Sequence, residues 1–473
     1  MEWQSAVRLA SDLRSGAVSA EDVMSEVYDR IERVNPQLNA IVSLVSRDEA
    51  MAAAREADTV PDADRGPLHG MPWAVKDAVT VRGFATAMGF APFADRIAET
   101  DDIQAARLRA AGVIFIGRTN MPEFGLGSHT FNNLYGVTRN PWAMDRTCGG
   151  SSGGAAVALA TGMLPLADGS DMGGSLRNPA SFCNVVGFRP SMGRTPAARE
   201  GGWHARLSTT GPMGVTVADT AFLMAQQAGP DLRDPITLDD PGTTFLAGME
   251  ALRDLAGKRI ALSPTMGGLP VDSEVESIIR NAGQTCASLG AEVELKDPPL
   301  AGAMDVFQVQ RAAALAGTGR MLDEALPDWR RHAKETAVWN IEKGLALSGE
   351  ELLKAEVERT RIYREMVAFF EDHDALLLPA AQVPPFPADQ DYVREINGVT
   401  MATYIDWMTV CCAVTITGFP TISVPAGFTD AGLPVGLQIV GKPRDDVGLL
   451  QLAGCFEAAT RCHERRPGIS AWG

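Results

Sequence analysis

The sequence has few of the side chains that usually build metal and redox sites. Its 473 residues include six histidines and seven cysteines, and no C-x-x-C pair occurs. An odd number of cysteines without such a pair predicts buried, reduced thiols rather than disulfides or a zinc site. The cysteines are Cys148, Cys183, Cys286, Cys411, Cys412, Cys455 and Cys462. The histidines, none in a recognisable triad context, are His69, His129, His204, His332, His373 and His463.

Long apolar runs, basic runs and linkers are absent as well. Residues 148–167 carry no charge, but this stretch is too short and too rich in glycine and proline to span a membrane. The N-terminus shows neither a basic n-region nor an apolar h-region, so we expect a cytoplasmic protein. A formal net charge of −17 argues against nucleic acid or an anionic membrane as a partner. Without a linker or repeat, a single domain over residues 1–473 is predicted.

Helix and strand patterns alternate along the chain. Amphipathic helices are predicted over residues 4–15 and 20–34, the second opened by Ser19 and Asp22 in a pattern that resembles a capping box. A long charged helix is predicted over residues 349–371. Short apolar runs predict strands buried on both faces at residues 72–75, 113–117, 259–263, 375–379, 421–425 and 436–440. The alternation predicts an α/β fold with one mixed sheet covered by helices on both faces.

Two glycine turns carry serines. Residues 149–154 read Gly-Gly-Ser-Ser-Gly-Gly, and residues 169–177 read Gly-Ser-Asp-Met-Gly-Gly-Ser-Leu-Arg. Glycine lets the backbone approach a bound group and turn several N–H donors toward one point, as oxyanion stabilisation requires, and a serine at the centre would be the nucleophile. Gly-Ser clusters are also ordinary loops. The apolar residues 155–166 between the turns indicate instead that both are carried on buried elements.

Two other motifs compete with this interpretation. Residues 149–153 match G-x-S-x-G, the nucleophile elbow of α/β-hydrolases, which requires a strand before the turn and later Asp and His partners. Residues 140–146 are predicted to be a loop, so the match is attributed to glycine density. Residues 436–442 read G-x-x-x-x-G-K, but Pro443 stands where a P-loop has serine or threonine. The sequence therefore predicts neither an elbow nor a P-loop.

A serine nucleophile needs a base, and Lys76 is the candidate. It ends the apolar run 72–75, where burial disfavours the ammonium form and lowers the pKa toward working pH. The alternative is that Lys76 forms an ion pair with Asp77 or another acid. Asp171 and Arg177 flank the second turn and are interpreted as a buried pair that holds it.

The two turns, together with segments before and after them, resemble the signature of the amidase signature family. The other matching segments are residues 72–77, 117–125, 179–183, 211–213, 374–379 and 418–425. They follow in the family's order over roughly residues 5–465, and the interval of 24 residues between Ser151 and Ser175 also fits. The resemblance implies the amidase signature fold, with a single large twisted sheet and the catalytic core within residues 70–225.

The resemblance also implies a role for individual residues. Lys76 would be the base, Ser151 the proton relay and Ser175 the nucleophile. A cis peptide bond is implied before Ser151. The oxyanion hole would be formed by the backbone N–H groups of Met172, Gly173, Gly174 and Ser175.

The expected reaction is hydrolysis of a small-molecule carboxylic amide to an acid and an amine or ammonia through a Ser175 acyl-enzyme. No metal or organic cofactor is expected, and a homodimer is left open. One branch of the family instead supplies ammonia from glutamine for tRNA-dependent transamidation, but residues 340–348 lack the tyrosine-rich sequence of that branch. A catalytically inert binding subunit is the third alternative, against which the presence of Lys76, Ser151 and Ser175 argues.

The sequence indicates less about which amide is the substrate. Met172, Asn178 and the Trp203-His204 insertion depart from the commonest family pattern. Six residues lie in segments that could line the pocket, although such side chains are more often core: Met88, Tyr135, Trp203, Phe386, Tyr404 and Trp407. If several converge, small aryl or acyl amides would fit better than a charged amino acid.

Overall fold

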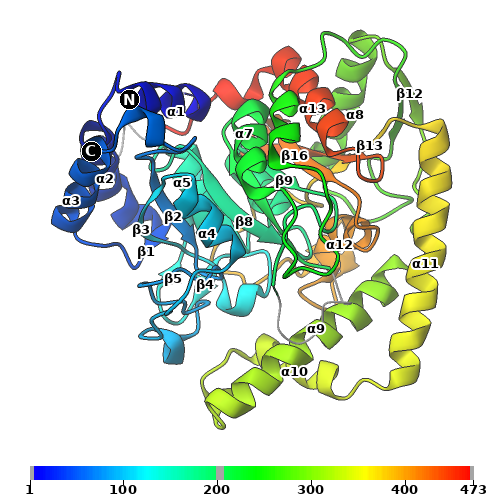
Figure 1. The fold of residues 1–473 in the computed structure, drawn as a ribbon. Coiled ribbons are helices and arrows are strands. Elements are labelled where there is room, and N and C mark those ends of the chain that lie inside the picture. The colour runs from blue at the N-terminus through cyan, green and yellow to red at the C-terminus, as the bar shows by residue number, and fades with distance from the viewer. Residues whose placement is uncertain (1–4, 199–206, 469–473) are drawn as a thin grey trace.

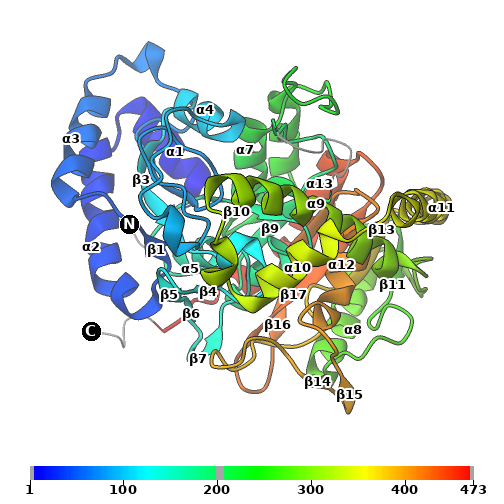
Figure 2. The same ribbon diagram turned by 90° about the horizontal axis from the view of Figure 1, so that it is seen from below.

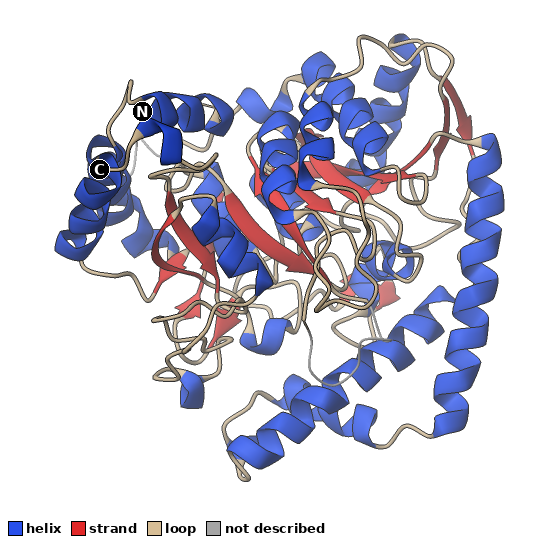
Figure 3. Ribbon diagram, viewed as in Figure 1, coloured by secondary structure: helices blue, strands red, loops and turns tan. Residues whose placement is uncertain are grey.

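An eight-stranded mixed sheet forms the centre of the computed structural model, which describes residues 5–198 and 207–468 (Figures 1 and 3). The spatial order is β12 (Glu292–Leu295), β11 (Arg259–Leu262), β13 (Ala375–Pro379), β17 (Pro434–Gly441), β16 (Thr421–Phe428), β9 (Val186–Arg189), β10 (Thr209–Gly214) and β8 (Ala167–Asp171). β12, β11 and β13 run parallel, and each later neighbouring pair is antiparallel. The predicted large mixed sheet is confirmed.

Both faces of this sheet are buried, as its continuous apolar strands predict. Along β13, Ala375 and Leu377 pack in one hydrophobic cluster, whereas Leu376 and Leu378 pack in another. The alternation follows from the two-residue period of a strand, which points successive side chains to opposite faces. One face is covered by α7 (Val217–Gln227), α8 (Ser273–Ser288) and α13 (Asp446–Thr460). The other is covered by α9 (Ala303–Ala325), α11 (Gly349–Asp372) and α12 (Thr409–Thr415).

A smaller sheet lies beside strand β8 and contains the predicted lysine strand. Its order is β1 (Ile41–Val42), β3 (Ile114–Thr119) and β2 (Pro72–Lys76), with β2 parallel to β3. The sequence led us to expect a single sheet. The two are joined by side-chain bonds instead: Trp73 Nε1 donates to Asp168 Oδ1 at 3.0 Å, and the Lys76 N–H donates to Asp168 Oδ2 at 3.2 Å. Asp168 thus places Lys76 next to the large sheet.

The remaining helices complete the molecule around the small sheet and the site. They are α1 (Ala6–Ser15), α2 (Ala20–Leu38), α3 (Arg47–Asp58), α4 (Ile103–Ala110), α5 (Gly153–Ala160), α6 (Arg177–Cys183) and α10 (Glu335–Leu345). Every residue of α5 and α6 is buried, which confirms that both glycine turns adjoin buried elements. Three short hairpins pair β4 (Phe131–Asn132) with β5 (Gly136–Val137), β6 (Arg139–Asn140) with β7 (Ala143–Thr147), and β14 (Glu395–Ile396) with β15 (Val399–Thr400).

The predicted element boundaries are close to the observed ones. α2 begins where predicted, and Ser19 Oγ accepts the N–H of Asp22 at 3.0 Å. The Asp22 carboxylate accepts a hydrogen bond from the Ser19 hydroxyl rather than from the Ser19 backbone N–H, so the reciprocal half of the capping box is not formed. The prediction of a loop over residues 140–146 is wrong, because the β6–β7 hairpin occupies it. Its short polar strands lack the apolar run from which the other strands were predicted.

Helices α9 and α10 lie at the bottom of the molecule as Figure 1 shows it, and the long helix α11 runs along its right side, where Figure 2 shows it nearly end-on. α9 packs against both α10 and α11. Ser348 caps α11 in a complete capping box with Glu351. Within residues 5–198 and 207–468, no helix is long and apolar enough to cross a bilayer.

Candidate active site

Lys76, at the end of β2, is the centre of a buried cluster of hydroxyl groups. Its side chain is 1% exposed. Nζ donates to Ser151 Oγ at 2.9 Å, to Ser152 Oγ at 2.8 Å and to Ser170 Oγ at 3.0 Å. A protonated lysine amine has three N–H donors, and here each of them donates to one of the three neutral hydroxyl groups. No carboxylate of the described chain lies within ion-pair distance of Nζ.

The electrostatics of the cluster bring the neutral and protonated forms of the amine close to balance near pH 7. Burial lowers the pKa of Lys76 to about 7, although the charges of Asp168 and Asp171 act in the opposite direction. The ion pair with Asp77 that the sequence left as an alternative is not formed. Asp77 Oδ1 and Oδ2 instead accept the N–H groups of Ala87 and Gly89, at 3.1 and 3.0 Å.

The first glycine turn is shaped by close contacts on both sides. A Cβ atom on Gly149, which has φ +78°, would lie 2.9 Å from Pro179 Cα, so only glycine fits there. The Gly150–Ser151 peptide bond is cis, as the resemblance implied. Ser151 and Ser152 then direct both hydroxyls at Lys76. The sequence prediction included Ser151 but missed Ser152.

The second turn leads from β8 into α6 and carries Ser175. The side chain of Ser175 is 8% exposed, and its carbonyl accepts the N–H of Ser152 at 3.2 Å, so the two turns are bonded directly. Gly174 has φ +106°, and a Cβ atom there would lie 2.8 Å from Cys411 Cβ. The N–H of Gly174 donates to Asp171 Oδ1 at 2.9 Å.

The other backbone donors of this turn are open. The N–H groups of Met172, Gly173 and Ser175 make no hydrogen bond within the described part of the chain. Buried or half-buried donors without a partner are unusual in a folded protein and mark a place where an acceptor can bind. Of the four predicted oxyanion-hole residues, three therefore offer an open donor, and the N–H of Gly174 is used by Asp171.

Asp171 and Arg177 form the predicted buried pair. Both side chains are fully buried, and Arg177 Nε and Nη2 donate to the two carboxylate oxygens at 2.9 and 2.8 Å. Burial alone would raise the pKa of Asp171, but the charges of Arg177 and Arg189 and the N–H of Gly174 outweigh burial and hold it far below its usual range. Arg177 also donates to Gln438 Oε1 at 2.6 Å, which ties the turn to β17.

A cavity of about 400 Å³ opens beside these groups. Lys76, Ser151, Ser170 and Ser175 lie in its wall, and a smaller lobe of about 40 Å³ adjoins it at Ser175. Much of the remaining wall is apolar. The larger of these apolar residues are Val79, Met88, Ile103, Met121, Phe124, Leu126, Met172 and Leu315.

Of the six aromatic and methionine residues singled out from the sequence, the five that the structure describes fall into three groups. Met88 lines the cavity and Tyr404 lines its lobe. Phe386 and Trp407 pack against Phe182 in the core, with ring centroids 6.4 Å from that ring, which agrees with the interpretation of such side chains as core rather than pocket lining. Tyr135 bonds Ser43 through its hydroxyl at 2.8 Å, outside the cavity. Trp203 lies outside the described residues.

The requirements of a nucleophile elbow are met only in part. Strand β7 does precede the first turn, contrary to the sequence prediction, but the histidine nearest to it serves the scaffold. His129 Nδ1 shares a hydrogen bond with Thr147 Oγ1 at 2.8 Å, and Nε2 shares one with the Ala388 carbonyl at 3.1 Å. Burial lowers the pKa of His129 to about 4. Lys76 holds the place next to Ser151 that a histidine base would need.

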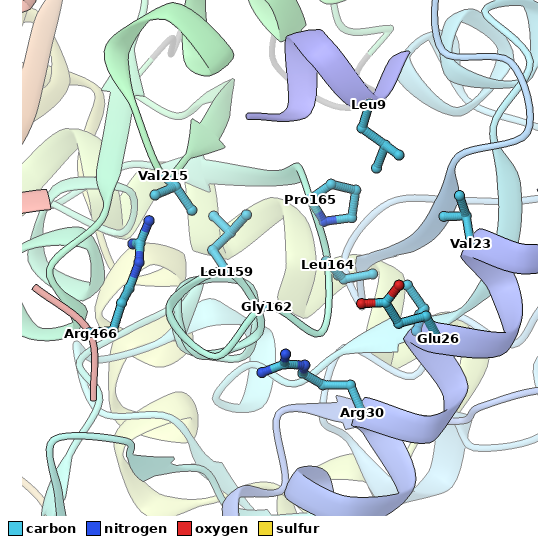
Figure 4. A pocket seen from close by; sticks show the side chains of 11 residues that line it. Leu9, Val23, Glu26, Arg30, Leu159, Gly162, Leu164, Pro165, Val215 and Arg466 are labelled. Atoms are coloured by element: carbon cyan, nitrogen blue, oxygen red, sulfur yellow. The ribbon is translucent and has the colours of Figure 1, made fainter. Parts of the chain in front are cut away.

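A second hollow, of about 60 Å³, lies between α1, α2 and the end of α5 (Figure 4). Figure 4 shows Leu9 and Val23 facing Pro165 and Leu164 across it, with Glu26 and Arg30 on the α2 side. It contains none of the serines, and Arg30 Nη1 donates to the Thr161 carbonyl at 3.3 Å. This hollow is separate from the hydroxyl cluster.

Comparison with known proteins agrees with the fold. A family model described as Amidase matches residues 22–450. An acylamidase of Rhodococcus erythropolis is 34% identical over 99% of this chain and 98% of its own. A glutamyl-tRNA(Gln) amidotransferase subunit of Chromohalobacter salexigens is 33% identical over 99% of both chains. The crystal structure of a bacterial aryl acylamidase of the amidase signature enzymes superposes with a TM-score of 0.90, 29% identity and 98% coverage of each chain.

The family match covers most of this chain, and the structural match covers nearly all of it, including the helix-covered mixed sheet. The protein belongs to the amidase signature family. It is an amidohydrolase that acts on carbon–nitrogen amide bonds.

The pair that holds the second turn gives a stability prediction. Asp171→Asn should lower the free energy of unfolding at pH 7 by about 3–5 kcal/mol, because Arg177 would be left as a buried charge without its carboxylate. The folded pKa of Asp171 is depressed, so its contribution is complete above the ordinary value of about 3.9 and is lost only in stronger acid. The deficit should therefore be equal at pH 5 and pH 7, as measured by urea unfolding.

Asp372→Asn is the matched control, since Asp372 is 78% exposed and faces Arg259 Nη1 at 3.4 Å on the surface. It should unfold like the wild-type protein. An Asp171→Asn protein as stable as this control would show that the turn does not depend on the pair.

Proposed function

We propose that this amidohydrolase works through an acyl-enzyme on Ser175, with Ser151 as proton relay and Lys76 as base. The observation that supports this most strongly is the buried Lys76 amine, which hydroxyl groups surround and whose pKa lies near 7. An amine that loses its proton near neutral pH, and touches a serine at 2.9 Å, is able to accept that serine's proton.

In the proposed reaction, protons pass between Ser175, Ser151 and Lys76. Ser175 Oγ bonds to the amide carbon as its proton passes to Ser151, and the Ser151 proton passes to the neutral Lys76 amine. The oxyanion that forms is stabilised by the open N–H donors of Met172, Gly173 and Ser175. The carbon–nitrogen bond then breaks, and the leaving nitrogen takes a proton from Lys76 through Ser151. Water then attacks the acyl-enzyme ester while its proton passes along the same relay through Ser151 to Lys76. This step releases the acid and regenerates Ser175. The chemistry needs no metal or organic cofactor.

The chain is proposed to act alone, as one domain over residues 1–473 with the catalytic core in residues 70–225. Every group that the steps use lies within that core, and no other chain is needed to supply one. We place the protein in the cytoplasm, because all seven cysteines are free thiols. A homodimer would be compatible with this activity.

The second candidate function is supply of ammonia from glutamine, which is suggested by the similarity to the glutamyl-tRNA(Gln) amidotransferase subunit of Chromohalobacter salexigens. Glutamine is a zwitterion and needs both a cation and an anion in its pocket. Among the described residues of the cavity wall the only carboxylate is Asp102, which is engaged at the start of α4, where it accepts the N–H groups of Ala105 and Thr80 at 2.8 and 3.2 Å. The apolar wall favours the hydrolase.

The first test separates these two functions. The purified chain should release aniline from simple anilides without ATP or another protein, because its site is complete, and should release little ammonia from glutamine. Aniline and ammonia are measured on the same preparation. Activity confined to glutamine and to mixtures with added subunits would overturn the proposal of an independent hydrolase.

The second test concerns the nucleophile. Ser175→Ala should abolish turnover while the protein remains folded, because the turn is held by backbone and Asp171 bonds rather than by the hydroxyl. A fluorophosphonate should label Ser175 in the wild-type protein, which peptide mass spectrometry identifies. Ser288→Ala, an exposed serine at the end of α8, is the control and should retain activity and labelling. A label on Ser151 or Ser152 would contradict the assignment.

The third test uses the charge of Lys76. The catalytic form is the neutral amine, so the rate should fall as the pH drops through about 7 and reach a plateau near pH 8 to 9. Lys76→Ala should cost about as much as Ser175→Ala, because members of one relay act as a unit. Lys76→Arg should not restore turnover, because guanidinium cannot give up its proton. Near-normal turnover by Lys76→Arg would mean that the base lies elsewhere.

A further inference from the structure

The small lobe beside Ser175 is walled on one side by helix α9. Phe307 and Arg311 lie one helical turn apart on α9, so their side chains share a face of the helix, and both line the lobe. A Cβ atom on Gly173 would lie 3.2 Å from Phe307 Cζ, so this face of α9 reaches the nucleophile turn. Across the lobe, Tyr404 lies next to Gly127. Arg311 is thus placed within the same lobe as Ser175.

Arg311 is a buried cation whose partners in the described chain are neutral. Its exposure is 4%. Nη1 donates to the Tyr404 hydroxyl at 2.9 Å, and Nη2 donates to Asn340 Oδ1 and, at 3.4 Å, to Gln308 Oε1. Nε is buried and has no hydrogen-bond partner, and no carboxylate of the described residues pairs with the guanidinium.

Three other buried arginines in this protein face a carboxylate, whereas a fourth, Arg118, also has neutral partners but lies outside the lobe. Arg177 and Arg189 face Asp171, with nitrogen-to-oxygen distances of 2.8 and 3.8 Å, and Arg194 faces Asp446 at 3.1 Å. A buried charge without an opposite charge is costly, and a donor left without an acceptor adds to that cost. Arg311 therefore has the capacity to bind an anion that the described residues do not supply.

We infer that the lobe is a carboxylate-binding subsite for the acyl part of the substrate, with Arg311 as the residue that selects it. The volume of about 40 Å³ offers room for about three water-sized groups, comparable to a carboxylate. Of the five N–H donors of the guanidinium, three are taken by Tyr404, Asn340 and Gln308, which leaves one on Nη1 and one on Nε for an anion. The Tyr404 hydroxyl, which accepts from Arg311 and from Asn340 Nδ2 at 2.7 Å, holds the guanidinium in place.

The assignment to the acyl side rests on the proposed function. The leaving nitrogen must receive its proton from Ser151, and Ser151 and Lys76 line the larger cavity but not the lobe. The amine part therefore departs through the larger, apolar cavity, and the acyl part extends into the lobe. The substrate class is a monoamide of a short dicarboxylic acid with an apolar amine, such as an anilide.

The experiment compares two anilides of similar length, succinanilate with a terminal carboxylate and neutral pentananilide. The wild-type protein should prefer succinanilate in kcat/KM. Arg311→Gln should lower the ratio of the two kcat/KM values by roughly 10- to 100-fold, the effect of losing a hydrogen-bonded charge. Arg320→Gln, an exposed position on the same helix, is the matched control and should keep the wild-type ratio and rates.

A merely structural role for Arg311 would lower both rates and leave the ratio unchanged, which would overturn the inference. A measurement on the wild-type protein is independent of folding: succinate should inhibit anilide hydrolysis at concentrations at least about 10-fold lower than butyrate, and equal inhibition would also overturn it. Hydrolysis of pentananilide without preference for succinanilate refutes the subsite alone. Absence of hydrolysis of any anilide refutes the proposed function.

Discussion

The carboxylate of Asp171 is the group on which the geometry of the site depends. It accepts the N–H groups of Gly174 and Leu176 on either side of Ser175, and it pairs with Arg177. Arg177 in turn donates to Gln438 on β17 and to Thr415 on α12. The turn is therefore bonded to the middle of the large sheet, and the open N–H groups beside Ser175 are fixed before any substrate arrives. Preorganised donors of this kind need no rearrangement when charge develops.

The same arrangement keeps the acids near Lys76 from pairing with it. Asp171 is occupied by Arg177, and Asp168 accepts Trp73 Nε1 and the backbone N–H of Lys76 rather than its amine. Burial raises the pKa of Asp168 to about 6, and burial lowers the pKa of Lys76 to about 7. Both carboxylates favour the protonated amine, but desolvation is the larger effect. A lysine that bonded a carboxylate directly would stay charged and could not serve as a base.

The sequence predicts the parts of this site that short segments determine. Burial of the strand that ends at Lys76, the two glycine turns and the Asp171–Arg177 pair follow from residues that are close in the chain. The sequence does not predict that Ser152 and Ser170 share Lys76, because this depends on how two turns 18 residues apart meet a strand from another sheet. Among the six residues that could have lined the pocket, the sequence does not distinguish Met88, which does, from Phe386 and Trp407, which pack in the core. Arg311 carries no local signal, because its proposed role depends on the neutral partners that distant segments, those of Asn340 and Tyr404, bring to it.

Helix α9 lines the substrate pocket but supplies none of the groups that carry out the chemical steps. Phe307, Arg311 and Leu315 are spaced four residues apart, so they form one stripe along the helix; the first two face the lobe and Leu315 faces the larger cavity. The stripe thus sets a cation on one side of Ser175 and apolar surface on the other. α9 packs against α10 and α11 and contributes no strand or turn to the catalytic core. Changes along its face would therefore alter which amide is held without disturbing the bonds that position Ser175 and Lys76.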